Sequence, residues 1–262
     1  MKNYFAGIDA GSTYTKGVLL DVNKSIVAMS ICKTRPEMLK AATSCFFDLC
    51  NKSGVDQNGV HVSVTGYGKD IVDFASTKES EQSCLALAAH TFNSDIRTII
   101  EVGGEDAKVL SINREGKMLD FVMNDKCSAG TGRFLEIMVN TMDITFDDIE
   151  KLSKNATKNI FLTSICSVFA QTEITCLISK GERVENIITA LLRSMAYRIS
   201  ELSQQIEIED VVCMAGGLAL SSVIIAEIER LIKRKILVVS YPQFLVAHGA
   251  ALKSMKTANI SR

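Results

Sequence analysis

The sequence predicts an α/β protein made of two similar halves, each with a sheet covered by helices. Short apolar segments with strand character alternate along the chain with longer segments of helical period. A nine-residue segment near the N-terminus recurs in the middle of the chain, which indicates an internal repeat. The length of 262 residues suits one large or two modest domains. These observations favour two related units.

The first half is expected over residues 1–95. A turn rich in Gly, Ser and Thr separates its first two strands, and Pro36 stands where a helix would have its first turn. The expected elements of this half are strands at 4–9, 14–20, 25–32 and 61–65 and helices at 36–50 and 80–92.

The second half is expected over residues 96–262, and the C-terminal helix would be free to pack back onto the first half. Its pattern of three strands resembles the start of the first half, and a long helical region follows. The expected elements are strands at 97–102, 106–112 and 117–123, a mostly helical region at 130–206, a strand at 211–215 and a helix at 218–233.

Composition and charge exclude several classes of protein. Hydrophobic residues make up 47% of the chain and prolines number only 2, so a disordered or low-complexity protein is excluded. The 29 basic and 30 acidic residues leave a net charge of -1, so no overall field would attract nucleic acid or an anionic membrane. The longest uncharged segments, 211–226 and 236–252, are shorter than the ~20 apolar residues that a membrane-spanning helix needs.

The N-terminal residues and the cysteines favour a cytoplasmic location. No long apolar segment with a small-residue cleavage site opens the chain. The 8 cysteines include no CxxC pair and have no regular spacing, which is unlike a disulfide framework. Most of them are therefore expected to be free thiols.

The internal repeat places two similar turns between strands. Residues 8–16 (IDAGSTYTK) align without gaps on residues 100–108 (IEVGGEDAK), with an apolar residue, a carboxylate, a Gly and a Lys at the same offsets. Backbone amides and hydroxyls in the first turn suit a phosphate, and Asp9 could hold Mg²⁺ through water. The alternative is a pair of ordinary hairpins, since neither turn is a Walker or Rossmann loop. The residues assigned to nucleotide binding in these hairpins are Gly11, Ser12, Thr13, Thr15, Lys16, Gly103 and Gly104.

A third glycine segment completes the pattern. Residues 211–215 read as a buried strand, Gly216 and Gly217 form a turn, and a helix follows, so adenosine could lie flat against the glycines. Gln243 is assigned to the same nucleotide. This order of motifs resembles the ATPase fold shared by acetate and sugar kinases, heat-shock 70 chaperones and actin. The resemblance implies two ribonuclease H-like domains, each with a five-stranded sheet, and ATP in the cleft between them.

Two cysteines stand in contexts unlike a protein core. Cys127 lies in a polar, Gly-rich segment, and Cys166 immediately precedes an extended helical pattern. Helix N-termini favour anions such as a thiolate or a thiolate-bound iron–sulfur cluster. A cubane cluster commonly takes four thiolates, so two per chain would require a homodimer that shares the cluster across a twofold axis. The alternative is that both are partly buried thiols near a helix start.

Four segments together resemble the activators of 2-hydroxyacyl-CoA dehydratases, a family that includes the ATPase subunits of benzoyl-CoA reductase. These segments are Gly7-Ile8-Asp9-x-Gly11-Ser12-Thr13, Val102-Gly103-Gly104, Met123-Asn124-Asp125-Lys126-Cys127-x-Ala129-Gly130-Thr131-Gly132-Arg133-Phe134-Leu135 and Cys166-x-Val168-Phe169-Ala170.

The resemblance to the activators implies a cofactor set and a function. It implies a homodimer with one [4Fe-4S] cluster ligated by Cys127 and Cys166, together with ATP or ADP and Mg²⁺. It also implies an ATPase coupled to electron transfer, which takes one electron from ferredoxin or flavodoxin and passes it to an iron–sulfur dehydratase or reductase. No phosphate would go to a substrate.

The chain departs from the family's pattern at the nucleotide. Relatives usually read Asp-x-Gly-Gly-Gln-Asp in the second hairpin, where this chain has Glu101 and Glu105 at the first and fifth positions. Asp9, Glu101 and Glu105 are the expected catalytic residues, and the extra negative charge of Glu105 is expected to slow or alter hydrolysis. Ser221 replaces a common Asn, and residues 243–246 lack an Asn-Gly-like step, so the adenosine contacts are expected to differ.

The remaining cysteines and histidines suggest no metal site. Cys32, Cys45, Cys50, Cys84, Cys176 and Cys213 are interpreted as core or surface thiols. The three histidines stand in no HExxH or CxxC context, so a zinc site is not expected. Two rival functions stay open, namely a small-molecule kinase of the same fold and a non-enzymatic scaffold related to actin-like proteins. Neither rival accounts for the two cysteine segments.

Overall fold

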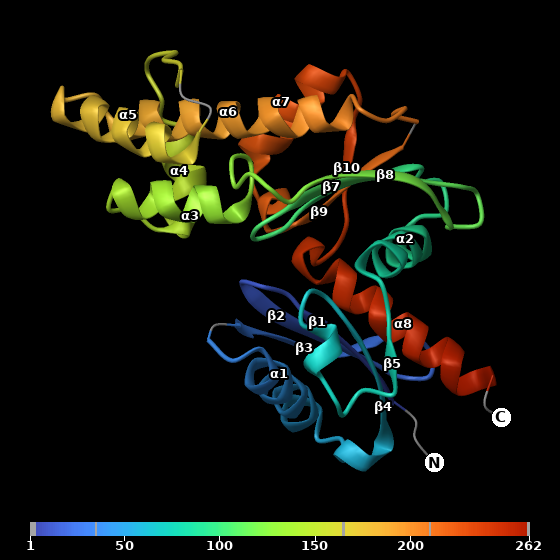
Figure 1. Cartoon of the computed structure of the whole chain (residues 1–262). Coiled ribbons are helices and arrows are strands. Elements are labelled where there is room, and N and C mark those ends of the chain that lie inside the picture. The colour runs from blue at the N-terminus through green and yellow to red at the C-terminus, as the bar shows by residue number, and fades with distance from the viewer. Residues whose placement is uncertain (1–3, 35, 164–165, 210, 261–262) are drawn as a thin grey trace. The chain divides into compact units, whose positions relative to one another are not determined.

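The computed structural model describes residues 4–34, 36–163, 166–209 and 211–260 (Figure 1). The described residues form two compact units. Unit 1 contains the chain up to Ile96, the segment Ile112–Leu119 and the chain from Val239 onward, whereas unit 2 contains Arg97–Ser111 and Asp120–Val238.

Unit 1 is built on a five-stranded sheet. Its strands lie in the order β3-β2-β1-β4-β5. The elements of this unit are β1 (Tyr4–Ala10), β2 (Tyr14–Leu20), β3 (Ile26–Lys33), α1 (Met38–Ser53), η1 (Gln57–Gly59), β4 (Val60–Thr65), η2 (Lys69–Ile71), β5 (Thr77–Lys78), α2 (Glu81–Phe92), η5 (Pro242–Phe244) and α8 (Leu245–Ile260).

Unit 2 carries a second five-stranded sheet with the order β10-β9-β6-β7-β8. Both β7 and β8 reach with one end into the segment that belongs to unit 1. The elements are β6 (Thr98–Val102), β7 (Ala107–Ile112), β8 (Met118–Asn124), α3 (Gly132–Thr141), η3 (Phe146–Asp148), α4 (Ile149–Ser153), α5 (Ser167–Ser179), α6 (Val184–Ser203), β9 (Val212–Gly216), η4 (Gly217–Leu220), α7 (Ser222–Ile232) and β10 (Ile236–Val238).

The two sheets have the same topology, which confirms the internal repeat. β1 pairs antiparallel with β2 and parallel with β4, and β6 pairs antiparallel with β7 and parallel with β9. The registers also agree, because Asp9 lies opposite Lys16 and Glu101 lies opposite Lys108. The α/β fold with two related sheets is therefore confirmed.

Helices α1 and α8 cover opposite faces of the first sheet (Figure 1). Successive residues of a strand point to opposite faces, so Ile8 joins the apolar cluster that includes Cys45 and Leu49 of α1, while Gly7 faces α8. A Cβ atom at Gly7 would lie 2.1 Å from the carbonyl oxygen of Ala247, so only glycine allows this approach. The C-terminal helix thus completes the core of unit 1.

The core of unit 2 is formed mainly by α6 and the central strands of the second sheet. Thirteen residues of α6 are buried, and the apolar cluster around them includes Ile100, Val109 and Met214 from three strands. Strand β6 is buried along its whole length, as expected for a central strand covered on both faces. None of the helices in the described ranges is long and apolar enough to cross a membrane.

Two helix starts differ from the sequence-based expectation. α1 begins at Met38 because Glu37 keeps an extended backbone at the N-cap, so Pro36 precedes the helix instead of opening it. The helix expected from Leu218 is a 3-10 turn followed by α7, since the Ser221 side chain accepts a hydrogen bond from the Ile224 amide and caps α7 there.

Candidate functional site

In unit 1, Asp9 and Lys16 form an ion pair next to the β1–β2 turn. Asp9 is 6% exposed near the end of β1, and Lys16 lies opposite it on β2. The distance between Lys16 Nζ and Asp9 Oδ2 is 3.3 Å. The second Asp9 oxygen lies beside the Gly66 backbone, because a Cβ atom there would be 2.7 Å from Asp9 Oδ1. A buried carboxylate and an adjacent ammonium group thus lie beside the β1–β2 turn.

Hydrogen bonds from Thr34 stabilise the turn formed by Gly11, Ser12 and Thr13. The Thr34 amide donates to the Thr13 carbonyl at 3.0 Å, and its hydroxyl donates to the Gly11 carbonyl at 2.7 Å. Thr15 contributes by a 3.0 Å hydrogen bond between its Oγ1 and that of Thr34. The Thr13 Oγ1 is buried and has no hydrogen-bond partner among the described residues. An unpartnered buried hydroxyl on a glycine-containing turn fits an oxygen-rich ligand such as phosphate.

The corresponding hairpin of unit 2 carries a more heavily charged network. Lys108 is 3% exposed, and its Nζ lies 3.5 Å from Glu101 Oε2 and 2.7 Å from Asp106 Oδ2. The Gly103 amide closes the turn by donating to the Asp106 carbonyl at 2.9 Å. Glu105 lies in the same turn and is half-buried. Two carboxylates thus surround one buried ammonium group. The attraction between these opposite charges offsets the cost of removing them from water.

The Gly216–Gly217 turn lies next to this hairpin in unit 2. Gly216 pairs with Val102 and has a φ of +86°, and a Cβ atom on it would lie 2.1 Å from the Val102 carbonyl oxygen. At Gly217 a Cβ atom would meet nothing within 4 Å, so the outer side of the turn is open. Gln243 belongs to unit 1, in η5, and is not brought to this turn by the fold of unit 2.

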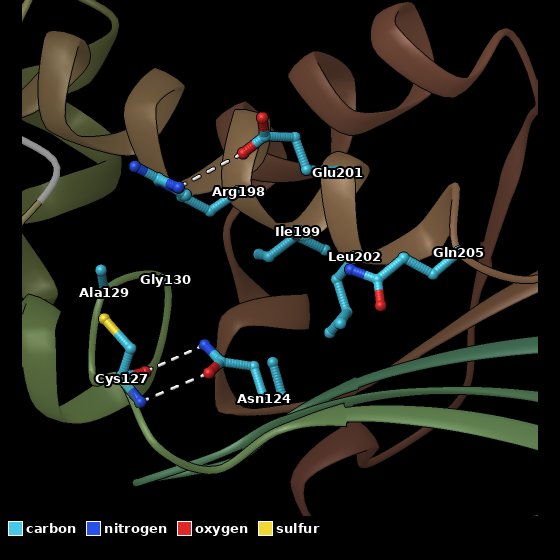
Figure 2. Close-up of a pocket in the computed structure, with 10 residues that line it drawn as sticks. Asn124, Cys127, Ala129, Gly130, Arg198, Ile199, Glu201, Leu202 and Gln205 are labelled. Atoms are coloured by element: carbon cyan, nitrogen blue, oxygen red, sulfur yellow. Dashed lines mark hydrogen bonds and ion pairs between the residues drawn. The ribbon is translucent and has the colours of Figure 1, made fainter.

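The structure places Cys127 in an exposed loop after β8, where Asn124 holds its backbone. Asn124 Nδ2 donates to the Cys127 carbonyl at 2.9 Å, and the Cys127 amide donates to Asn124 Oδ1 at 3.3 Å. The loop borders a cavity of about 220 Å³ that is also lined by residues of α6 (Figure 2). Among these are Arg198 and Glu201, whose side chains lie 3.4 Å apart.

Cys166 is the N-cap residue of α5 and is exposed. Its carbonyl accepts the first hydrogen bond of the helix, from the Ala170 amide at 2.8 Å. The segments of the two cysteines meet, because Ser128 Oγ donates to Ser167 Oγ at 3.2 Å. The structure therefore brings together the residues that follow Cys127 and Cys166, which lie 39 positions apart in the chain.

The other six cysteines behave as interpreted from the sequence. Cys45, Cys50, Cys84 and Cys213 are buried, Cys32 is partly buried, and Cys176 is exposed on α5. Burial raises the pKa of Cys45, Cys84 and Cys213 to about 12. Burial also lowers the pKa of His248. In the described part of the chain, no group of three or more His, Cys, Asp or Glu side chains is arranged to hold a metal ion.

Sequence reasoning did not identify Thr34, Asn124 or the Ser128–Ser167 pair as part of the site. Thr34 follows the third strand and reaches the turn only through sheet pairing. Ser128 and Ser167 are separated by 39 positions and belong to no shared motif. Only Asn124, three residues before Cys127, had a local signal, since Asn side chains commonly bond to nearby backbone groups.

Comparison with known proteins finds relatives that match nearly the whole chain. The chain is 35% identical to the 2-hydroxyisocaproyl-CoA dehydratase activator of Clostridioides difficile, over 99% of this chain and 97% of the relative. It is also 35% identical to the (R)-2-hydroxyglutaryl-CoA dehydratase activating ATPase of Acidaminococcus fermentans, over 98% and 99% of the two chains.

Among solved structures, this chain also matches a dehydratase activator over nearly its whole length. The activator of 2-hydroxyisocaproyl-CoA dehydratase from Clostridium difficile with bound ADPNP superimposes with a TM-score of 0.94 at 36% identity, over 98% of this chain and 96% of that chain. A ROK family glucokinase from Streptomyces griseus shares the fold alone, with a TM-score of 0.60 at 12% identity. The model of the BadF/BadG/BcrA/BcrD ATPase family matches residues 6–254, and this chain belongs to that family.

Proposed function

We propose that this chain is an ATP-dependent activator that delivers a low-potential electron to a 2-hydroxyacyl-CoA dehydratase or a related iron–sulfur enzyme. The electron would come from ferredoxin or flavodoxin and pass through one [4Fe-4S] cluster held in a cytoplasmic homodimer. The observation that carries the proposal is the hydrogen bond between Ser128 and Ser167, which joins the segments of two exposed cysteines beside the β6–β7 hairpin.

The residues of the two hairpins fit a nucleotide and Mg²⁺. In unit 1, the turn of Gly11, Ser12 and Thr13 offers amides and hydroxyls to phosphate, and Thr13 Oγ1 is a buried donor that a phosphate oxygen would satisfy. Asp9 would hold Mg²⁺ through water, with Lys16 balancing its charge. In unit 2, Gly103 and Gly104 would face the phosphates, and the open turn of Gly216 and Gly217 would face adenosine.

The residues around the cysteines fit a shared iron–sulfur cluster. Cys127 and Cys166 are exposed thiols, and Cys166 stands at the N-terminus of α5, where backbone amides favour an anionic group. Two thiolates per chain make half of a four-thiolate set, so a second copy would supply the rest. When bound, the cluster would accept and donate one electron at low potential.

Hydrogen bonds connect the phosphate hairpin of unit 2 to both cysteine segments. The amides of Gly132 and Arg133 at the start of α3 donate to the carbonyls of Gly103 and Gly104, at 3.0 and 2.7 Å. The Thr131 hydroxyl donates to the Ser128 carbonyl at 2.7 Å, and Ser128 continues to Ser167. A shift of the hairpin when the γ-phosphate is lost would therefore move the start of α3 and the Cys127 loop together.

Hydrolysis would depend on the carboxylates around the γ-phosphate. Glu101 is held beside Lys108, and Glu105 adds a negative charge to the same turn. Repulsion between Glu105 and the γ-phosphate would slow hydrolysis compared with a neutral amide at this position.

Iron content and ATP binding test the proposal. Protein purified without oxygen should absorb broadly in the visible range and carry about two iron atoms per chain, as a cubane shared by two chains requires. Cys127→Ser and Cys166→Ser should abolish iron binding but not ATP binding. Cys176→Ser, which changes a third exposed thiol, on α5, is the matched control and should retain iron.

The same measurements separate the rival functions. A small-molecule kinase would transfer the γ-phosphate to a hydroxyl compound and would need no iron. Iron-free dimers, or monomers with a full complement of iron, would refute the shared cluster. Retention of iron in both the Cys127→Ser and Cys166→Ser variants would refute the ligand assignment.

A further inference from the structure

Asn124 fixes the backbone of Cys127 from the end of a strand. It is the last residue of β8, so its position is set by the second sheet. Its side-chain amide bonds to Cys127 twice, as donor to the carbonyl at 2.9 Å and as acceptor from the amide at 3.3 Å (Figure 2). A side chain that bonds to both polar groups of one residue restricts the direction in which that residue's own side chain leaves the backbone.

Ser128 and Ser167 connect the two cysteine segments directly. Each serine immediately follows one of the cysteines, and their hydroxyl oxygens are 3.2 Å apart. Ser128 is itself held, because its carbonyl accepts from the Thr131 amide at 3.0 Å and from the Thr131 hydroxyl at 2.7 Å. Ser167 is the first residue of α5. The bond therefore joins a fixed turn to the start of a helix.

Thr163, three residues before Cys166, is bonded to α5 as well. Glu173, about two turns into α5, accepts hydrogen bonds from the Thr163 amide at 2.9 and 3.1 Å and from the Thr163 hydroxyl at 3.0 Å. Glu173 thus holds Thr163 on the N-terminal side of Cys166, and Ser128 holds Ser167 on its C-terminal side.

We infer that Asn124, Ser128 and Ser167 form a ligand brace, a set of positioning residues that fixes Cys127 and Cys166 relative to one another. The inference rests on the proposed function, because it concerns how the two thiols are presented to iron. Groups that orient metal ligands through hydrogen bonds affect metal retention although they do not touch the metal. The brace acts on the backbone beside each thiol, so its loss should loosen the site and leave the nucleotide hairpins intact.

The test compares iron loss in variants of the iron-loaded dimer prepared without oxygen. Asn124→Ala should release iron to an excess of a ferrous chelator about ten times faster than the parent, which is the lower range for groups that orient metal ligands. It should also change the electron paramagnetic resonance spectrum of the reduced cluster. Asn124→Asp keeps the acceptor for the Cys127 amide and loses the donor, so its rate should lie between those of Asn124→Ala and the parent.

The serines are tested by a double-mutant cycle. Ser128→Ala and Ser167→Ala should each speed iron release, and the double variant should be no faster than the faster single variant, because both remove the same bond. Ser179→Ala is the matched control, since this serine also lies on α5 but bonds to the Thr175 carbonyl. It should release iron at the parental rate.

Two results separate the failure of the brace from the failure of the proposed function. Parental iron release and an unchanged spectrum in Asn124→Ala and in both serine variants, with iron still dependent on Cys127 and Cys166, would overturn the brace alone. A parent chain that binds no iron would overturn both. Unchanged ADP affinity in each variant shows that the fold is intact, so faster iron release there supports the brace.

Discussion

The backbone amide of Arg133 donates a 2.7 Å hydrogen bond to the carbonyl oxygen of Gly104, and this bond ties the start of α3 to the β6–β7 turn. The adjacent bond from Gly132 to Gly103 makes the attachment double. A helix whose first residues are bonded to a turn follows that turn when it moves, because the helix is stiff along its axis. The Cys127 loop lies on the chain between β8 and α3 and is carried with it.

Disturbing this attachment should uncouple the nucleotide from the cluster. A Cβ atom on Gly132 would lie 3.1 Å from the Gly103 carbonyl oxygen, so Gly132→Ala should push the turn and helix apart. We expect the paramagnetic resonance spectra of the ADP and ATP-analogue states to become more alike than in the parent. Gly59→Ala, at an open position, is the control. A spectral difference as large as that of the parent would contradict the coupling.

Replacing Glu105 by Gln should accelerate ATP hydrolysis. The substitution removes a negative charge from the β6–β7 turn and puts a neutral amide of similar size in its place. We expect a rise in kcat of about ten-fold, equivalent to about 1.4 kcal/mol of activation free energy. The measurement is steady-state phosphate release, with Glu115→Gln on the exposed β7–β8 turn as the control. A rate at or below that of the parent would show that Glu105 does not oppose the γ-phosphate.

The cysteines should differ sharply in reactivity. In iron-free folded protein, an alkylating reagent at pH 8 should label Cys127, Cys166 and Cys176 first, since these thiols are exposed. Cys45, Cys84 and Cys213 should resist it, because burial both blocks access and raises their pKa to about 12. Peptide mass analysis before and after unfolding measures this difference. Early labelling of Cys84 or Cys213 would contradict the burial of these thiols in α2 and β9.

Glu182 should make part of the stability dependent on pH. Hydrogen bonds from the Asn186 side chain, the Arg183 amide and Lys158 lower its pKa from 4.5 to about 2. A lowered pKa in the folded state means that the stabilisation is complete above about pH 4.5 and is lost as the pH falls toward 2. Glu182→Gln should therefore lower the free energy of unfolding at pH 7, and the deficit should shrink between pH 4.5 and 3 in urea titrations.

The control for this prediction is Glu207→Gln, which changes an exposed carboxylate. It should leave the free energy of unfolding nearly unchanged at each pH. A deficit for Glu182→Gln that stays constant from pH 7 to 3 would show that the carboxylate charge does not stabilise the fold.

The sequence was most informative where the structure depends on local pattern. The two hairpins could be predicted because strand alternation and the offsets from Asp9 to Lys16 and from Glu101 to Lys108 are local properties. The predicted helix start at Leu218 is earlier than the observed start of α7 at Ser222, because a 3-10 turn follows the glycines and Ser221 caps α7. The predicted nucleotide and cluster residues stay predictions, although the fold and the family are confirmed.

The contacts that organise the cysteine site could not be predicted. Ser128 and Ser167 meet only after α3 and α5 have packed together, and serine hydroxyls carry no pairing preference that a sequence reveals. Thr34 likewise reaches Gly11 through the pairing of β2 with β3. These are tertiary contacts between residues more than twenty positions apart. The local conformational propensities of the residues do not predict such contacts.

The place of α8 has a consequence for how the chain is made. Helix α8 completes the core of unit 1 by packing against β1, where the Ala247 backbone lies close to Gly7. β1 is nevertheless synthesised first and α8 last. Unit 2 ends at Val238, so its whole sequence, together with the hairpin tip Ile112–Leu119, is synthesised before α8. Domains generally fold as they emerge during synthesis. Unit 2 can therefore fold during synthesis, whereas unit 1 can complete its core only after α8 has been made.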